Sequence, residues 1–275
     1  MSHPVWLIAK QEFTLNRRNR WVISFAVVFS VLTILVSLLG MVTSGYSGFQ
    51  DFVRTSASII NLDGFIVPLF ALLLGVFSFL SHREHLELMV TQPISRAKII
   101  LGKYLGLLLT VIGATLLGFG LPGIVFSLAV GVEGAFQYFI VVLLALLLSV
   151  VFTGLAVLIS LLSRRQQIAL GVSVGLWIFF ELLYGMLMLG TTLHFSHATL
   201  KVLLLAGLTG NPVDLTRVLS LLVIGGPHFF GPAGATLIKL TGSASVASLL
   251  GLAAILLWIV IPMLVSIRVF SRQNL

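Results

Sequence analysis

Six long blocks of apolar residues, almost free of charge, constrain this chain more than any other feature of its sequence. A helix needs about 20 mostly apolar residues to cross the roughly 30 Å hydrocarbon core of a bilayer. Within that core a helix satisfies its own backbone hydrogen bonds. No block alternates apolar and polar residues as a membrane barrel strand does. The blocks therefore predict an all-α membrane protein with six transmembrane helices, at residues 22–42, 59–80, 105–130, 136–162, 168–190 and 246–267.

The composition places residues 1–275 in one transmembrane domain and excludes several classes of protein. Hydrophobic residues make up 59% of the chain and charged residues only 9%, whereas a soluble domain carries about 25% charged residues. The chain has no cysteine, which excludes disulfides, thiolate metal sites and cysteine nucleophiles. Its positive charges are scattered between apolar blocks, so we expect the lipid bilayer as a partner and no nucleic acid.

The distribution of lysine and arginine predicts how the chain is oriented in the membrane. With the N-terminus in the cytoplasm, twelve of the 16 lysines and arginines lie on the cytoplasmic side and four lie outside. This bias follows the positive-inside rule. We therefore expect both termini in the cytoplasm.

The N-terminal segment, residues 1–21, is expected to form an amphipathic helix ahead of the first span. Over residues 4–20, one face would carry Val5, Trp6, Ala9 and Phe13, and the other Lys10, Thr14, Arg17 and Arg18. A helix of this kind lies in the plane of the lipid headgroups. A simple topology anchor is the plainer interpretation.

Two segments interrupt the pattern of spans. The third span contains Gly118, Gly120, Pro122 and Gly123, which should kink or break the helix. In the extracytoplasmic segment 191–245, the apolar runs 200–208 and 218–224 are too short to cross. They read as re-entrant or interfacial helices separated at Asn211. A single kinked span is the alternative, but it would place the C-terminal arginines outside.

Residues 81–104 carry the densest cluster of charge in the chain and lie between the second and third spans. A short helix over residues 82–89 should stop at Pro93, and a second should begin after Ser95 as its N-cap. The sequence thus predicts a cytoplasmic helical hairpin held between two spans. Such a hairpin suits the transmission of force from a soluble partner.

Three apparent catalytic motifs fail on inspection. Residues 45–48 read Gly-Tyr-Ser-Gly, but no histidine lies within a span to activate the serine. His82 and His85 lack the spacing of a zinc protease and a third ligand. Gly102–Lys103 lacks the first glycine of a phosphate loop, because residue 97 is alanine. An intramembrane hydrolase is therefore disfavoured, and any ATPase that drives this chain is expected to be a separate polypeptide.

Glu181 is the acidic residue that we place deep in the fifth span. A charge there costs about 2.5–3.5 kcal/mol on insertion scales, so the side chain should face the protein interior. Helical spacing puts Ser173, Trp177, Tyr184 and Met188 on the same face. Glu181 is then either a pathway or conformational-switch residue, together with Trp177, Tyr184 and Met188, or a protonated carboxyl hydrogen-bonded between helices.

Thioether and imidazole side chains gather beyond Glu181, at Met186, Met188, His194 and His197. Such ligands suit Cu(I), so a soft-metal path is one hypothesis. The alternative is lipid-facing methionine with interfacial histidine, since Met186 and Met188 point to different sides of a helix.

The chain resembles the permease subunits of type-2 ABC exporters over essentially its whole length. The resemblance rests on residues 6–13 followed by 18–21, on Glu84 with Leu86–Glu87–Leu88, on the turn 93–96 and on Gly102–Lys103. The family's usual Gly-Thr ahead of Leu-Glu-Leu is absent, with His85 in its place.

This resemblance implies a multi-pass protein of the bacterial inner membrane that binds no cofactor itself. ATP and Mg²⁺ would bind a separate ATPase, on which the hairpin would dock. Two permeases would form a homodimer, for which the first span and the fifth, with Gly171 and Gly175, are our candidate interface. The expected ATPase-coupling residues are Glu84, Glu87, Leu88, Pro93 and Arg96.

Within the family, residues 211–217 and 230–234 are most similar to the branch that serves the copper centres of nitrous oxide reductase. That similarity implies a periplasmic partner and copper or a sulfur species as cargo. Asn211, Asp214 and Arg217 are the expected partner contacts. Asp214 and Arg217 are also spaced to pair with each other on a helix. A general exporter of lipids, drugs or glycans is the rival interpretation.

Overall fold

The computed structural model describes residues 4–43, 49–81, 86, 89–130, 132–163, 165–194, 197–224 and 242–273. Every regular element within these residues is a helix. Six helical segments are long and apolar enough to cross a membrane: Arg20–Leu39, Ser56–Ser81, Arg96–Gly120, Phe136–Leu162, Gln166–Thr191 and Ala244–Arg272. The predicted all-α fold with six spans is confirmed.

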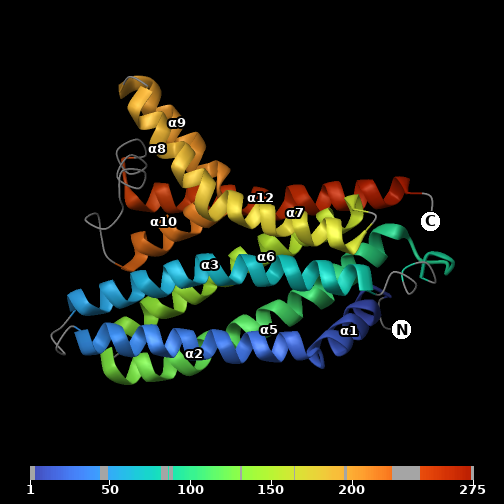
Figure 1. The fold of residues 1–275 in the computed structure, drawn as a ribbon, viewed down its shortest axis with the longest axis horizontal. Helices are drawn as coiled ribbons and strands as arrows, with labels where there is room; N and C mark the ends of the chain where they lie inside the picture. Colours follow the sequence, from blue (N-terminus) through green and yellow to red (C-terminus); the bar gives the residue numbers. More distant parts are fainter. Residues whose placement is uncertain are drawn as a thin grey trace.

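The long helices run side by side, and the N- and C-termini lie at the same end of the bundle, which we call the terminal end (Figure 1). The elements are α1 (Pro4–Arg17), α2 (Arg20–Thr43), α3 (Phe49–Ser81), α5 (Arg96–Val130), α6 (Val132–Leu162), α7 (Gln166–Ile178), the π-helical turn η1 (Phe179–Leu183), α8 (Tyr184–His194), α9 (His197–Gly210), α10 (Pro212–Ile224) and α12 (Ala244–Arg272).

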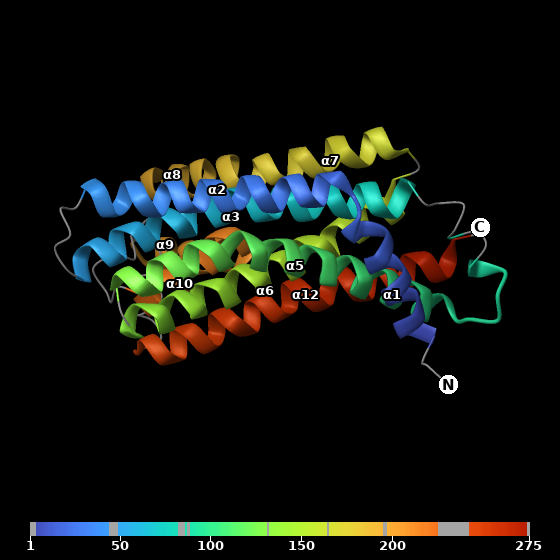
Figure 2. The same ribbon diagram turned by 90° about the horizontal axis from the view of Figure 1, so that it is seen from below.

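Helix α6 lies at the centre of the bundle and packs against α3, α5, α10 and α12. Of the most apolar stretch of α6, 72% lies buried inside the protein. For the fifth span, which begins with α7, that share is only 11%. In the view of Figure 2, α7 and α8 lie along one edge of the bundle. The apolar outer faces of α2, α7 and α12 therefore need lipid or another subunit to cover them.

The predicted break in the third span does not occur, because α5 continues through Pro122. Proline removes one backbone donor from the helix. Side chains of neighbouring helices donate to carbonyls in the turn before it: Ser30 Oγ to Leu117 O at 3.0 Å and the Tyr138 hydroxyl to Phe119 O at 2.8 Å. Such contacts let a membrane helix tolerate proline without ending.

The segment after the fifth span forms two short helices that meet at Asn211, as the sequence predicted. Helices α9 and α10 have 14 and 13 residues, too few to span the bilayer. Helices α8 and α9 project from the bundle as a hairpin (Figure 1), and α10 returns to pack against α3, α6 and α12. The single kinked span is therefore not formed, and α10 is a buried helix rather than an interfacial one.

Candidate functional site

Helix α1 lies across α5 at two glycines. A Cβ atom on Gly102 would lie 2.7 Å from Ile8 Cβ, and one on Gly106 would lie 2.5 Å from Glu12 Cβ. No other residue type leaves room for this approach of the two backbones. Gly102, which belongs to no phosphate loop, thus serves helix packing at the terminal end of the bundle.

That approach brings a buried ion pair together, which we call the Glu12 cluster (Glu12, Asn16, Ser78 and Lys103). Lys103 Nζ lies 2.8 Å from Glu12 Oε2, with side chains 1% and 3% exposed. Ser78 Oγ donates to Glu12 Oε1 at 2.6 Å, and Asn16 Nδ2 donates to Ser78 Oγ at 2.8 Å. The Lys103 ammonium also sits 5.4 Å from the centre of the Phe79 ring. One polar network therefore joins α1, α3 and α5.

The Glu12 cluster corrects the faces predicted for the N-terminal helix. The buried side of α1 is made of Ile8, Ala9, Glu12 and Asn16, and Trp6 is exposed. Two polar side chains can turn inward because each finds hydrogen-bond partners on the helices they meet. The helix is docked on α5 instead of lying free in the headgroup plane.

Of the residues predicted to contact the ATPase, Glu84, Glu87 and Leu88 lie outside the described residues. Pro93 is exposed in the turn before α5. Arg96 donates from Nη1 to Phe270 O and Ser271 O, each at 3.2 Å, and to Gln273 O. A cation is favourable at the carbonyl end of a helix, so Arg96 ties the start of α5 to the end of α12.

A second polar group, the Arg217 cluster (Asn211, Asp214, Arg217 and Glu181), lies between η1 and α10. Arg217 Nη2 is 3.0 Å from Glu181 Oε1, and Nη1 is 2.8 Å from Asp214 Oδ1. Asn211 Nδ2 donates to Asp214 Oδ2 at 2.7 Å and to Phe180 O at 2.9 Å. The local pair expected from the spacing of Asp214 and Arg217 is thus formed, and Glu181 extends it to the fifth span.

Local sequence explains how α10 presents this cluster. Asn211 caps the helix, since its Oδ1 accepts from Val213 N at 3.0 Å, and proline follows at the first helical position, where it fits well. Asp214 lies in the first turn, where a negative charge is favourable. On the other side, Glu181 lies in a π-helical turn, a geometry that is rare and often found at functional sites.

Helix α3 contributes a further carboxylate that we did not identify in the sequence. A Cβ atom on Gly64 would lie 3.5 Å from Arg217 Nη2, so the guanidinium rests on the α3 backbone. The neighbouring Asp63 is 4% exposed, and its Oδ1 has no hydrogen-bond partner among the described residues. Asp63 lies close enough to interact electrostatically with Glu181 and Arg217. Glu181 is therefore not the one acidic residue within a span.

The predicted face of the fifth span points into the protein. Trp177 Nε1 donates to Phe65 O at 2.9 Å, and the Tyr184 hydroxyl donates to Gly207 O at 2.7 Å. Met188 packs over Gly207. The structure thus brings Trp177, Glu181, Tyr184 and Met188 to one side of the span, against α3, α9 and α10.

The four proposed soft-metal ligands are not brought together by what the structure describes. Met186 is exposed, and Met188 is turned toward α9. His194 ends α8 and His197 begins α9, but their side chains lie outside the described part. Among the described residues, no three histidine or acidic side chains form a group that could hold a metal ion.

Comparison with known proteins places these features in context. Residues 6–275 match the model of the ABC-2 family transporter proteins. A probable ABC transporter permease protein NosY from Pseudomonas aeruginosa is 35% identical over 229 residues, which cover 79% of this chain and 81% of that protein. The probable NosY permease of Stutzerimonas stutzeri is 31% identical and covers 98% of this chain and 99% of its own length.

Proposed function

Because this chain belongs to the ABC-2 transporter family, we propose that it is a permease subunit that couples ATP hydrolysis on a separate ATPase chain to work in the membrane. The family match confirms the resemblance drawn from the sequence. The chain is a multi-pass protein of the bacterial inner membrane. On this proposal it carries no catalytic site of its own.

The Glu12 cluster is the observation that carries the proposal. Ser78 lies just before the predicted hairpin of residues 81–104, and Lys103, in α5, lies near the other end of that segment. The carboxylate of Glu12, which belongs to α1, contacts both of these side chains. A force applied to the hairpin by a docked ATPase would therefore move α1, α3 and α5 as one body.

We test docking by reversing the charge of the hairpin with Glu84→Lys and Glu87→Lys. A NosF-type ATPase should no longer co-purify, while the permease stays folded in detergent. Arg165→Glu, a charge reversal at an exposed position at the same end of the bundle, is the matched control and should leave the complex intact. Survival of both co-purification and ATP-dependent function in the hairpin variant would contradict the proposal.

A homodimer is the second part of the proposal. A Cβ atom on Gly171 or Gly175 of α7 would meet nothing within 4 Å, which leaves a smooth surface for close helix packing. The chain has no cysteine, so Gly175→Cys introduces a single reactive thiol. This variant should form a crosslinked dimer, whereas Leu256→Cys on the exposed face of α12 should not. A functional complex with one permease would contradict it.

The cargo proposed from the NosY-named relatives is copper or a sulfur species for nitrous oxide reductase. In this scheme the permease exports the cargo, or performs conformational work on a NosD-type periplasmic partner. The strictest test of a copper path replaces Met186, Met188, His194 and His197 together and follows copper loading of the reductase. Full loading would exclude the path, and Met188 would then be only a packing residue over α9.

The alternative is a general exporter of lipids, drugs or glycans, which would need no NosD-type partner. Asp214 and Arg217 remain 30% and 27% exposed, so they can contact a partner, whereas Asn211 is fully buried. The Asp214→Ala variant should lose the periplasmic partner with normal expression if this surface is the contact. Lost expression would instead indicate a purely structural pair.

A further inference from the structure

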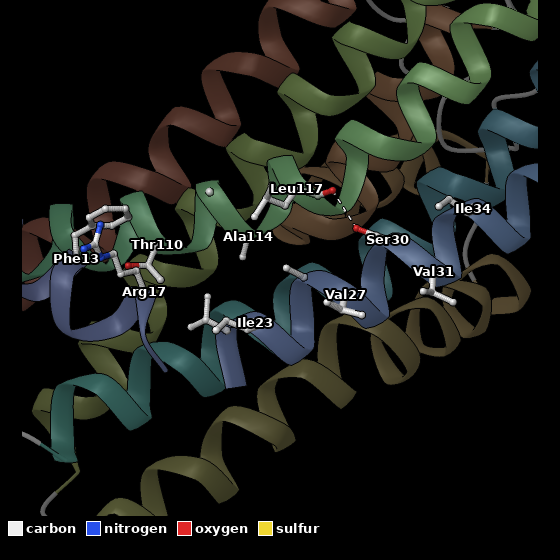
Figure 3. Close-up of a pocket in the computed structure, with 13 residues that line it drawn as sticks. Phe13, Arg17, Ile23, Val27, Ser30, Val31, Ile34, Thr110, Ala114 and Leu117 are labelled. Carbon is white, nitrogen blue, oxygen red and sulfur yellow. Dashed lines mark hydrogen bonds between the residues drawn. The ribbon is translucent and has the colours of Figure 1, made fainter. Parts of the chain in front are cut away.

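A groove of about 610 Å³ runs along the outside of the bundle where α1, α2 and α5 meet. Figure 3 shows Arg17 and Phe13 at one end of it and Val31 and Ile34 toward the other. Of the 13 residues that line it, only Arg17, Ser30 and Thr110 have polar side chains. The groove therefore runs along the first span, from the α1–α2 junction toward the middle of α2.

Glycines of α5 explain why the groove exists. The space beside Gly106 is filled by Glu12 of α1, and the space beside Gly118 is filled by Phe29 of α2. Between them, a Cβ atom on Gly113 would meet nothing within 4 Å. The groove is the unfilled stretch between these two helix contacts.

Along its apolar length, between the two ends, the groove offers its occupant no free hydrogen-bond donor. Ser30 Oγ donates to Leu117 O at 3.0 Å, and Thr110 Oγ1 donates to Gly106 O at 3.0 Å. Both hydroxyl protons are thus used within the helices. Water would find few partners here, and an empty groove would forfeit dispersion contacts, so an apolar chain is the fitting occupant.

The end of the groove near the α1–α2 junction carries positive charge. Arg17 is exposed, and no carboxylate of the described residues forms an ion pair with it. Arg18 and Arg20 follow directly and are also exposed. The exposed Trp21 stands beside them, which is typical of the headgroup level of a membrane.

We propose that this groove binds an anionic glycerophospholipid, with one acyl chain between α2 and α5 and its phosphate on Arg17. The lining residues of α2 run from Val22 to Ile34, which is roughly 18 Å of helix. That length matches one leaflet of a hydrocarbon core of about 30 Å. The positively charged end selects a lipid with a net negative headgroup.

Charge also argues against a second copy of the permease as the occupant. A two-fold interface places the same surface of both subunits in contact. With both copies inserted in the same orientation, Arg17, Arg18 and Arg20 would lie at the same depth as the three equivalent arginines of the other copy, which adds like charge along the interface. A lipid phosphate instead offsets part of this positive charge, and it binds the α1–α2 junction next to the Glu12 cluster.

The test uses the purified permease–ATPase complex in nanodiscs of equal phosphatidylglycerol and phosphatidylcholine, with retained lipid counted by native mass spectrometry. The wild type should retain phosphatidylglycerol preferentially. Arg17→Gln should reduce that preference about fivefold, the effect of one basic residue at a membrane surface. Gly113→Leu should fill the groove and lower retention of both lipids.

Matched controls keep the result specific to the groove. Arg165→Gln removes an exposed charge elsewhere at the terminal end, and Gly120→Leu fills open space on α5 outside the groove. Both should retain lipid as the wild type does. Val31→Phe narrows the groove from α2 and replaces Gly113→Leu if that variant unfolds.

Three results would overturn the proposal. Wild-type retention in both Arg17→Gln and the groove-filling variant would place the lipid elsewhere. Equal retention of the two lipids by the wild type would exclude the preference for an anionic headgroup, because both lipids carry a phosphate and only phosphatidylglycerol has a net negative charge. A crosslink between two copies through Val27→Cys would show that a second permease covers the groove.

Discussion

The two polar clusters of the bundle differ in how completely their charges are matched. The Glu12 cluster sets one lysine against one glutamate, and both side chains are almost fully buried. Around Arg217, a single guanidinium faces Glu181 and Asp214, with Asp63 nearby. Glu181 Oε2 and Asp63 Oδ1 have no hydrogen-bond partner among the described residues.

This difference indicates different mechanical roles. A buried and balanced ion pair is costly to open, because each charge would lose its partner in a low-dielectric region. A group with more carboxylates than cations can instead exchange partners or take up a proton at little cost. We therefore regard the Glu12 cluster as a fixed joint and the Arg217 cluster as the part that rearranges.

The largest expected effect comes from Lys103→Met. It leaves Glu12 buried without its cation, which should cost about 3–5 kcal/mol of folding free energy. The complex should lose most of its yield, measured by fluorescence-detected size exclusion and thermal unfolding. Adding Glu12→Gln should restore much of the stability, since the unpaired charge is removed. Equal stability of Lys103→Met and the wild type would contradict the fixed joint.

Arg217→Gln should have a smaller effect on folding, about 1–3 kcal/mol, because the cluster is partly exposed. The protein should still assemble with its ATPase but lose ATP-dependent function. Glu181→Gln added to this variant should recover stability by removing one of the excess carboxylates. A loss of assembly as severe as that of Lys103→Met would erase the distinction between the clusters.

The double variant that exchanges Asp214 and Arg217 should be less stable to heat than the wild type, although the two residues still pair with each other. The exchange keeps their own contact, which is worth a few tenths of a kcal/mol in an exposed helix. The exchange also removes the guanidinium from position 217, where it binds Glu181 in the wild type. Adding Glu181→Gln to the exchanged protein should recover thermal stability. Full recovery by the exchange alone would show that Glu181 contributes nothing.

Asp63→Asn should have the smallest effect, with a thermal midpoint equal to or above that of the wild type. The substitution preserves side-chain volume and removes a buried carboxylate that lacks a full set of partners. The matched change Glu12→Gln breaks a closed network and should lower the midpoint clearly. Destabilisation of the two variants by the same amount would mean that Asp63 is as tightly held as Glu12.

The spans could be predicted because membrane insertion depends on hydrophobicity along the chain, a local property. The inward face of Glu181 followed from helical spacing and the cost of burying a charge in lipid. Asp63 was equally visible in the second span, and the same argument should have singled it out. The dipeptide Asn211–Pro212 was also a sufficient signal for the boundary between α9 and α10.

The contacts between distant residues could not be predicted in this way. Glu12 and Lys103 are 91 residues apart, and nothing local to either one identifies its partner. The only signal was a polar pair, Glu12 and Asn16, spaced to share one side of an amphipathic helix with Ile8 and Ala9. The π-helical turn at Glu181 has no sequence pattern that we could recognise. The effect of Pro122 depended on donors from two other helices.

Hydrogen–deuterium exchange of the permease–ATPase complex, with and without a trapped nucleotide, tests the contrast between joint and moving part most directly. We predict that peptides covering α1 and the first turns of α5 exchange equally slowly in both states. Peptides covering η1 and α10 should change their exchange when the nucleotide is trapped. A change confined to α1 and α5, or no change around Arg217, would contradict this prediction.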